Sequence, residues 1–327
     1  MKKLLSLALA AMLLLLPVVA GAQALSLNHV GATNHPYHAG SLKFAELVNE
    51  YTNGSLTVDV FPASQIASGA KAIEFVQMYT LDIALESTMA FSNFVPEVGV
   101  LDMPFLFDSK EQAWAILDGE VGARLGELSE AQGFKVLGWW DNGFRNITST
   151  KGAITKPEDL KGLKIRTPES TVFLVTFETL GAVPTPMAVS EVFSALQLGT
   201  VDAQENPDNN NLNNKYTEIC PYYSITKHIY TAEPLVMNLD RFNSFTPEEQ
   251  EALLRAGKEA GEYQRQVSLE LDVTNYQTIL DTGVNVNVVE DMAPFREACA
   301  PVYDAFGDRF GEMFALIDAA KAELAAQ

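Results

Sequence analysis

The chain has 327 residues, of which 47% are hydrophobic and 20% charged, and its formal net charge is −20. An excess of acidic residues of this size repels nucleic acid and anionic lipid, so neither is expected as a partner. A mature chain of about 300 residues suits two domains of about 150 residues, each with a substantial core.

The N-terminus predicts an export signal. Residues 2–3 are lysines, residues 4–16 form an apolar core, and Ala22-Gln23-Ala24 fits the small-x-small pattern of a cleavage site. The apolar stretch is short for a membrane span of about 20 residues, so we predict a cleaved signal peptide over 1–24 rather than an anchor. Cleavage after Ala22 is the alternative. Removing two lysines from 22 Lys and Arg leaves 20 against 42 Asp and Glu, a net charge of −22, in a mature chain that should not insert into a membrane.

The chain has two cysteines, Cys220 and Cys299. An exported protein reaches an oxidising compartment, where they are able to pair. Their separation in sequence does not show whether they meet, and we favour two buried free thiols over a disulfide.

The first half of the chain alternates strands and helices. We expect strands at 25–30, 55–61 and 81–85, with helices at 38–52 and 69–79. This order is typical of a mainly parallel sheet covered by helices, so the fold class is α/β. Two more helices are expected between 110 and 132, followed by a strand at 134–140.

The same pattern then restarts. We expect a short helix from 156, strands at 163–167 and 201–204, and helices at about 170–180 and 190–196. The restart indicates a second α/β lobe. Because no flexible linker separates the lobes, the chain should cross between them on strands that form a hinge.

The C-terminal part reads as helical. Thr246-Pro247-Glu248-Glu249 combines a capping residue, a proline in the first turn and a capping-box glutamate, so a long helix should begin there and run to about residue 280. That length is enough to cross both lobes. A strand at 284–289 and two helices over 291–325 should follow.

Three polar residues lie near the ends of short strands and suggest an anion site. Arg145 occurs in GWWDNGFRN, Arg166 in LKGLKIRTP and Asn206 in VDAQENP. Ligands of open α/β sheets bind at strand ends, and a guanidinium gives a carboxylate two parallel hydrogen bonds. The alternative is that each arginine forms an ordinary ion pair at the surface or between the lobes.

Other residues are candidates for the same cleft. Trp139 and Trp140 follow one another on a strand, so one ring is able to stack on a ligand while the other faces a core. The polar candidates are Asn34, His35, Glu86, Asn142, Asn209 and Asn210. We find no motif of a catalytic, nucleotide-binding or metal site, and expect no cofactor and no metal. His35 and His38 are read as part of a polar loop rather than as a metal pair.

The order of several motifs resembles one family, the DctP-type extracytoplasmic solute receptors of TRAP transporters. The resemblance covers essentially the whole mature chain. Its motifs are Phe61-Pro62-Ala63-Ser64-Gln65, Asp102-Met103-Pro104-Phe105-Leu106-Phe107, Gly143-Phe144-Arg145, Leu160-Lys161-Gly162-Leu163-Lys164-Ile165-Arg166, Pro184-Thr185-Pro186-Met187, Ser190-Glu191-Val192-Phe193 and Val201-Asp202-Ala203-Gln204-Glu205-Asn206-Pro207.

The resemblance implies a two-lobed periplasmic binding protein fold with hinge strands and a long bridging helix. It implies that Arg166 pairs with a ligand carboxylate, supported by Arg145 and Asn206. In some relatives, including sialic-acid receptors, the acid that matches Glu86 lies in the cleft on the opposite lobe. Relatives often carry an aromatic residue at the position of Val189, so the pocket wall should differ here. The implied partners are a small organic acid and the small and large membrane subunits of the transporter.

We therefore interpret the chain as a non-enzymatic, monomeric periplasmic receptor for a small monocarboxylate, with a sugar acid such as a uronate or an aldonate as the favoured ligand. Lobe I should comprise 25–143 and 232–271, and lobe II should comprise 144–231 and 272–327. A receptor for a C4-dicarboxylate or small hydroxy acid is the alternative ligand reading. An exported enzyme acting on a carboxylated sugar, with Glu86 as acid or base, is the alternative class. The lack of a second well-placed carboxylate argues against that enzyme.

Overall fold

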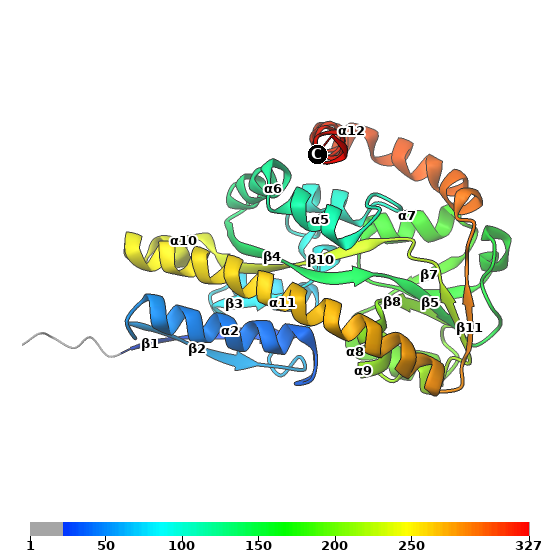
Figure 1. Ribbon diagram of the computed structural model, residues 1–327, viewed down its shortest axis with the longest axis horizontal. Coiled ribbons are helices and arrows are strands. Elements are labelled where there is room, and N and C mark those ends of the chain that lie inside the picture. Colours follow the sequence, from blue (N-terminus) through cyan, green and yellow to red (C-terminus); the bar gives the residue numbers. More distant parts are fainter. Residues whose placement is uncertain (1–21, 327) are drawn as a thin grey trace, which may run out of the picture.

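The computed structural model describes residues 22–326, which form two α/β lobes, each built around its own sheet (Figure 1). The predicted signal segment up to residue 21 lies outside the described residues. The two-lobed α/β prediction is confirmed.

The first sheet has five strands in the order β2-β1-β3-β10-β4. Strands β1, β2 and β3 are parallel, as the alternation of strands and helices predicts, whereas β10 runs antiparallel to both of its neighbours. The strands are β1 (Gln23–His29), β2 (Leu56–Phe61), β3 (Ile83–Leu85), β4 (Phe134–Phe144) and β10 (Tyr230–Asn238).

The second sheet has six strands in the order β11-β9-β5-β8-β6-β7. Strand β6 is parallel to β7 and β8, while β5 is antiparallel to β8 and β9. The strands are β5 (Asn146–Ser149), β6 (Lys164–Thr167), β7 (Val183–Pro186), β8 (Ala203–Asn206), β9 (Tyr222–Ile225) and β11 (Asn285–Val288).

Helices cover both sheets (Figure 1). Those between the strands of the first sheet are α2 (Pro36–Tyr51), α3 (Ala70–Gln77), α4 (Thr88–Phe91), η2 (Pro96–Asp102), α5 (Lys110–Leu117), α6 (Glu120–Glu130) and, after β10, α10 (Leu239–Asn243). Those between the strands of the second sheet are η3 (Pro157–Leu160), α7 (Thr171–Thr179), α8 (Val189–Gln197), α9 (Asp208–Asn213) and η4 (Tyr216–Glu218).

The chain crosses between the sheets where the site is built. Strand β4 ends at Phe144, Arg145 follows, and β5 begins in the second sheet. The return passes from β9 through residues 226–229 into β10, which is buried along its whole length. Strand β10 was not predicted, because its apolar run contains Glu233 and Pro234 in place of a regular alternation.

A third crossing is the long helix α11 (Pro247–Asp281), which lies diagonally across both lobes in Figure 1. Thr246 and Glu249 form the expected capping box, with each side chain bonded to the other's backbone N–H. The helix packs on α2 and β4 at its start and on α9 further along. At Gly257 an added Cβ would lie 2.3 Å from the carbonyl oxygen of Leu137, so glycine allows the helix to touch β4. The predicted bridging helix is confirmed.

The C-terminal segment forms one helix, α12 (Ala293–Ala325), so the prediction of two helices is wrong. Pro301 lies inside it and removes one backbone hydrogen bond. The helix nevertheless continues, because its buried side chains recur every three or four residues on both sides of the proline. They are Phe295, Cys299, Val302, Phe306, Phe310, Met313 and Ile317. The helix packs on α5, α6, η2 and α7, and so touches elements of both sheets.

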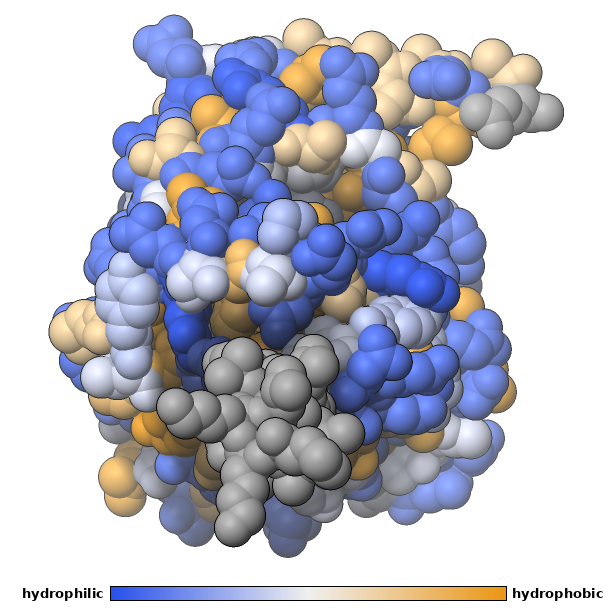
Figure 2. Space-filling model, turned by 90° about the vertical axis from the view of Figure 1, so that its left-hand side faces the viewer, coloured by the Kyte–Doolittle hydropathy of each residue, from blue (hydrophilic) through white to orange (hydrophobic). Residues whose placement is uncertain are grey.

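Cys220 and Cys299 are both buried and free, as expected. No helix within residues 22–326 combines the length and apolar character that a membrane span needs. On the face shown in Figure 2, hydrophilic residues predominate outside the part that grey atoms cover. Such a surface agrees with the acidic composition of the chain.

Candidate functional site

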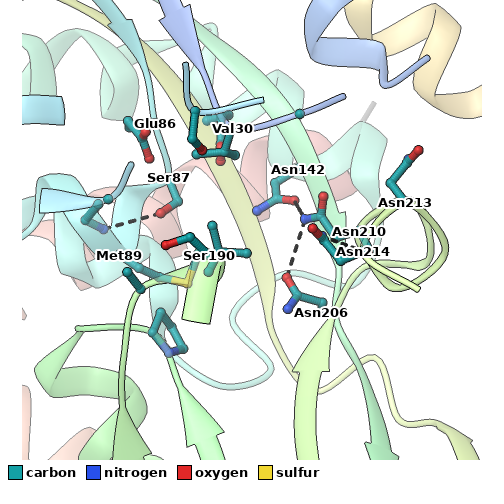
Figure 3. A pocket seen from close by; sticks show the side chains of 18 of the residues that line it. Val30, Glu86, Ser87, Met89, Asn142, Ser190, Asn206, Asn210, Asn213 and Asn214 are labelled. Carbon is teal, nitrogen blue, oxygen red and sulfur yellow. Dashed lines mark hydrogen bonds between the residues drawn. The ribbon is translucent and has the colours of Figure 1, made fainter. Parts of the chain in front are cut away.

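A cavity of about 350 Å³ lies between the lobes and is lined from both sheets. That volume falls within the range of sites for small organic ligands. Figure 3 shows Glu86 and Ser87 on one side of it and Asn142, Asn206 and Asn210 on the other. The residues expected from the sequence that line it are His35, Glu86, Asn142, Arg145, Arg166, Val189, Asn206 and Asn210.

Arg166 lies on β6 and is 3% exposed. Its Nε and Nη2 both donate to the carbonyl oxygen of Met187, at 3.1 and 2.7 Å, and none of the salt bridges formed by residues 22–326 includes it. Burial lowers the pKa of Arg166 to about 10, so the guanidinium remains charged at neutral pH. Within residues 22–326, the buried guanidinium of Arg166 thus donates to a neutral carbonyl and has no anionic partner, although buried charges in proteins are usually paired.

Arg145 is equally buried, but it already has an anionic partner. Its Nε and Nη2 donate to the two carboxylate oxygens of Glu205, at 2.5 and 2.9 Å. Nη2 also donates to Asn206 Oδ1 at 3.1 Å, while Nη1 has no partner. Arg145 therefore forms an ion pair within the protein, which is the alternative that the sequence left open for each arginine. Only Nη1 remains to donate to a ligand.

Asparagine side chains connect this region across the cavity. Asn206, the last residue of β8, donates to Gln204 Oε1 at 2.7 Å. Asn210 Nδ2 donates to Asn142 Oδ1 at 3.1 Å and to Asn206 Oδ1 at 3.4 Å, which are the contacts drawn between these residues in Figure 3. The amides of Asn142 on β4 and Asn210 on α9 thus join the two lobes beside Arg145.

His35 adds a second bond between the lobes. It caps helix α2, where its Nδ1 accepts the backbone N–H of Tyr37 at 3.2 Å. Burial lowers the pKa of His35 to about 4, so the ring is neutral at pH 7. Because Nδ1 accepts, Nε2 carries the hydrogen and donates it to Asn210 Oδ1 at 2.9 Å. A small polar network therefore fixes the side chains around the cavity.

The first-sheet side of the cavity contains two buried acids. Glu86 follows β3, and Glu233 lies on β10, the neighbouring strand. Burial raises the pKa of Glu233 to about 8, and burial together with the nearby Glu233 raises the pKa of Glu86 well above its usual value. Sequence reasoning missed Glu233. The available signal was a lone charged residue inside the apolar run YTAEPLVMN.

Glu233 also changes one argument made from the sequence. The sequence shows no second well-placed carboxylate near Glu86, which argues against an enzyme acting on sugars. The structure supplies that second carboxylate, so this argument is corrected.

Several expected residues lie outside the cavity. Trp140 is wholly buried and its Nε1 donates to the carbonyl of Gly257 on α11, at 3.0 Å. Trp139 donates to the carbonyl of Gly122 on α6, at 3.3 Å. Because side chains alternate along β4, the two rings pack against helices on opposite faces of the strand. The expectation that one of them stacks on a ligand is therefore wrong.

Two expected asparagines also lie elsewhere. Asn209 accepts a hydrogen bond from Asn275, at 2.6 Å, and so holds α9 to α11. Asn34 is exposed in the loop before α2. Within residues 22–326, no group of three or more His, Cys, Asp or Glu side chains is placed to hold a metal ion.

Known proteins resemble this chain over nearly its whole length. Residues 27–309 match the model of the bacterial extracellular solute-binding proteins, family 7. The 2,3-diketo-L-gulonate-binding periplasmic protein YiaO of Escherichia coli strain K12 is 35% identical over 295 residues, which cover 90% of this chain and 87% of YiaO.

Solved structures of TRAP periplasmic solute-binding proteins share the fold. One from Sulfitobacter sp. NAS-14.1, with bound β-D-galacturonate, has a TM-score of 0.86 and 33% identity, over 90% of this chain and 98% of that one. Another from Sulfurospirillum deleyianum, with bound succinate, has a TM-score of 0.84 and 33% identity, over 91% and 98%. The chain belongs to the bacterial extracellular solute-binding proteins of family 7.

Proposed function

We propose that this protein is a periplasmic receptor that binds a sugar monocarboxylate between its lobes and delivers it to the small and large membrane subunits of a TRAP transporter. The observation that carries the proposal is Arg166, a buried guanidinium without an acidic partner on the wall of the cavity between the lobes. A ligand carboxylate supplies the missing charge. It also accepts from Nη1 of Arg145 and from the amide of Asn206.

The proposed ligand class is a uronate or an aldonate. The cavity offers amide and carboxyl groups that hydrogen-bond hydroxyls, and the relatives include proteins described with galacturonate and 2,3-diketo-L-gulonate. A dicarboxylate is the alternative ligand class, because one relative has been solved with bound succinate. A second ligand carboxylate would lie beside Glu86 and Glu233, which offer its buried charge no cationic partner.

We propose binding without turnover. Glu86 and Glu233 come from neighbouring strands of one sheet, so they face the ligand from the same side. Hydrolysis of a glycosidic bond instead needs two carboxyl groups that flank the bond. Incubation of the protein with methyl galacturonide, followed by NMR, should show no released methanol.

The lobes are proposed to divide where the chain crosses between the sheets. Lobe I comprises 25–143 and 232–271, and lobe II comprises 144–231 and 272–327. Helix α12 contacts elements of both sheets, so it is proposed to connect the lobes rather than to serve one alone. The protein is proposed to act as a monomer after export.

The function is tested by calorimetry with galacturonate and with succinate. We expect the wild type to bind galacturonate and Arg166→Lys to lose at least about 2 kcal/mol of binding free energy, because lysine cannot make two parallel bonds to a carboxylate. Arg309→Lys is the matched control, since Arg309 is exposed on α12. Wild-type affinity in Arg166→Lys would exclude the carboxylate role.

A further inference from the structure

The first-sheet wall of the cavity contains two carboxyl groups, carried by neighbouring strands. Glu233 is 1% exposed on β10 and Glu86 is 2% exposed directly after β3. The backbone N–H of Glu86 donates to the carbonyl of Pro234, at 3.4 Å, so the two backbone segments that hold the acids are paired. Within residues 22–326, neither acid takes part in a salt bridge.

Each acid has an oxygen that the protein leaves without a hydrogen bond. These atoms are Oε1 of Glu86 and Oε2 of Glu233, and both residues line the cavity. The hydroxyl of Tyr37 neighbours the carboxyl group of Glu233 and is the protein group able to bond it. Buried polar atoms in proteins nearly always have partners. Two unpaired oxygens on one wall of a ligand cavity therefore indicate that the ligand supplies the partners.

The protonation of the pair determines which partners suit it. Both pKa values are raised, that of Glu233 to about 8, and the proximity of the two carboxyl groups is part of the cause for Glu86. Two neighbouring carboxyl groups of this kind retain a proton at neutral pH. A protonated acid donates a hydrogen bond and a carboxylate accepts one, so the pair complements groups that do both.

We propose that Glu233 and Glu86 form a hydroxyl-binding subsite, and that Glu233 determines the preference of the receptor for hydroxylated monocarboxylates. This inference rests on the proposed function, because it assumes that Arg166 holds the carboxylate of the ligand. The carboxylate end of the ligand then contacts the second-sheet wall, and the hydroxyl-bearing end contacts the acid pair on the first-sheet wall.

The subsite rejects two kinds of ligand. A deoxy analogue leaves the buried oxygens of the pair without partners, and that loss weakens binding. A dicarboxylate places a second buried negative charge beside the pair, which offers it no cationic partner. Selectivity against both kinds of ligand thus comes from one wall, whereas affinity for any carboxylate comes from the other.

The test compares galacturonate with its 2-deoxy analogue and with succinate by calorimetry. In the wild type we expect galacturonate to bind roughly ten-fold to a hundred-fold more tightly than the deoxy analogue. Glu233→Met keeps the volume but removes both oxygens, and should bring the two affinities to within about three-fold of each other. Glu191→Met is the control, because Glu191 is exposed on α8 and does not line the cavity.

A conservative variant separates hydrogen bonding from packing. The amide of Glu233→Gln still donates and accepts, so this variant should retain most of the discrimination that Glu233→Met loses. If Glu233→Met fails to fold, the pH dependence of Glu233→Gln decides the matter. Wild-type affinity for galacturonate should fall as the pH rises through about 8, because Glu233 then loses its proton and becomes negatively charged. Glu233→Gln should not show this fall.

Other charged or titratable groups surround Glu233 and belong in the analysis of that profile. They are His35 at the N-cap of α2, Tyr37 on α2, Glu86 after β3, Asp102 on η2, Asp141 on β4 and Arg145 after β4. Because Glu233→Gln leaves all of them in place, a pH dependence that persists unchanged in this variant arises from one of them and overturns the role of Glu233.

The outcomes distinguish this inference from the proposed function. If the wild type binds no sugar acid, the proposed function fails and the subsite fails with it. If the wild type binds galacturonate but Glu233→Met discriminates against the deoxy analogue as the wild type does, the receptor function stands and the subsite is overturned.

Discussion

The two walls of the cavity differ in how their charges are satisfied before a ligand binds. On the second-sheet wall, Arg145 is neutralised by Glu205, and Arg166 alone lacks an anion. On the first-sheet wall, Glu86 and Glu233 reduce their charge by taking up protons, as their raised pKa values indicate. The comparison shows that one wall supplies a fixed charge for a carboxylate and the other supplies adaptable hydrogen-bonding groups.

The largest effect should separate the two arginines of the second-sheet wall. Arg145→Ala leaves Glu205 buried without its ion-pair partner, so the free energy of unfolding should fall by about 3–5 kcal/mol. Arg166→Ala removes a charge that has no partner, so the free energy of unfolding should stay the same or rise. Urea unfolding of both variants measures this difference.

The exposed Arg309→Ala serves as the control for that experiment and should unfold like the wild type. Equal losses of stability in Arg145→Ala and Arg166→Ala would contradict the contrast between a neutralised and an unpaired arginine.

The next effect concerns the acid wall and pH. Glu233 has a pKa of about 8 in the folded protein against 4.5 as its ordinary value, so between these pH values the folded state holds a proton that the unfolded state has lost. The free energy of unfolding therefore falls as the pH rises from 4.5 to about 8. Glu233→Gln removes this dependence. The stability difference between Glu233→Gln and the wild type should therefore shift in favour of the variant by about 3 kcal/mol between pH 4.5 and pH 7.

Urea midpoints of unliganded wild type and Glu233→Gln, taken at intervals between pH 4.5 and pH 8, measure that effect. Parallel profiles would show that Glu233 is ionised in the folded protein. A stability gain of Glu233→Gln at pH 7 would show that burial of the Glu233 carboxyl group lowers the stability of the unliganded protein.

A somewhat smaller effect should appear when a ligand connects both walls. A ligand that contacts Arg166 on one sheet and Glu233 on the other favours the closed arrangement of the lobes. At one hundred times its dissociation constant it should add about 2.7 kcal/mol to the free energy of unfolding. Thermal unfolding with galacturonate measures the stabilisation, and small-angle scattering measures the compaction. Identical scattering curves with and without saturating ligand would contradict lobe closure.

The sequence predicted the parts of the fold that local patterns encode. The strands and helices of the first half, the capping box at Thr246 and the long helix after it depend on spacing and on single capping residues. Strand β10 and the continuity of α12 depend instead on tertiary packing. Burial on all sides removes the alternation of β10, and a continuous apolar stripe carries α12 past Pro301.

The site shows the same division between local and tertiary information. Motifs pointed to Arg145, Arg166 and Asn206 together, and these residues do meet at one cavity. The sequence did not show that Glu205 neutralises only one of the arginines, because the two arginines stand in similar short motifs. Nor did it show that Glu233 lies beside Glu86, since 147 positions separate two residues that only the pairing of β3 with β10 brings together.

The smallest expected effect concerns the first strand of the first sheet and the place where the signal peptide is cut. Gln23 and Ala24 belong to β1 and pair with Leu56 and Thr57 of β2. The backbone N–H of Gln23 also donates to the carbonyl of Ser55, at 2.8 Å. Cleavage after Ala24 would remove these two paired residues. Cleavage after Ala22 would keep them, and Ala20-Gly21-Ala22 fits the small-x-small pattern equally well.

We therefore favour the alternative cleavage after Ala22 over the predicted cleavage after Ala24, and expect mature protein recovered from the periplasm to begin at Gln23, as measured by intact mass. A chain that begins at Leu25 lacks hydrogen bonds of the β1–β2 ladder and should lose about 1–2 kcal/mol of unfolding free energy relative to one that begins at Gln23. Because this pairing lies at the edge of the first sheet and away from the cavity, both chains should bind galacturonate with the same affinity. A native mass that corresponds to a start at Leu25 would contradict the expectation. It would mean that the recognition of the signal peptide, rather than the integrity of β1, determines the N-terminus.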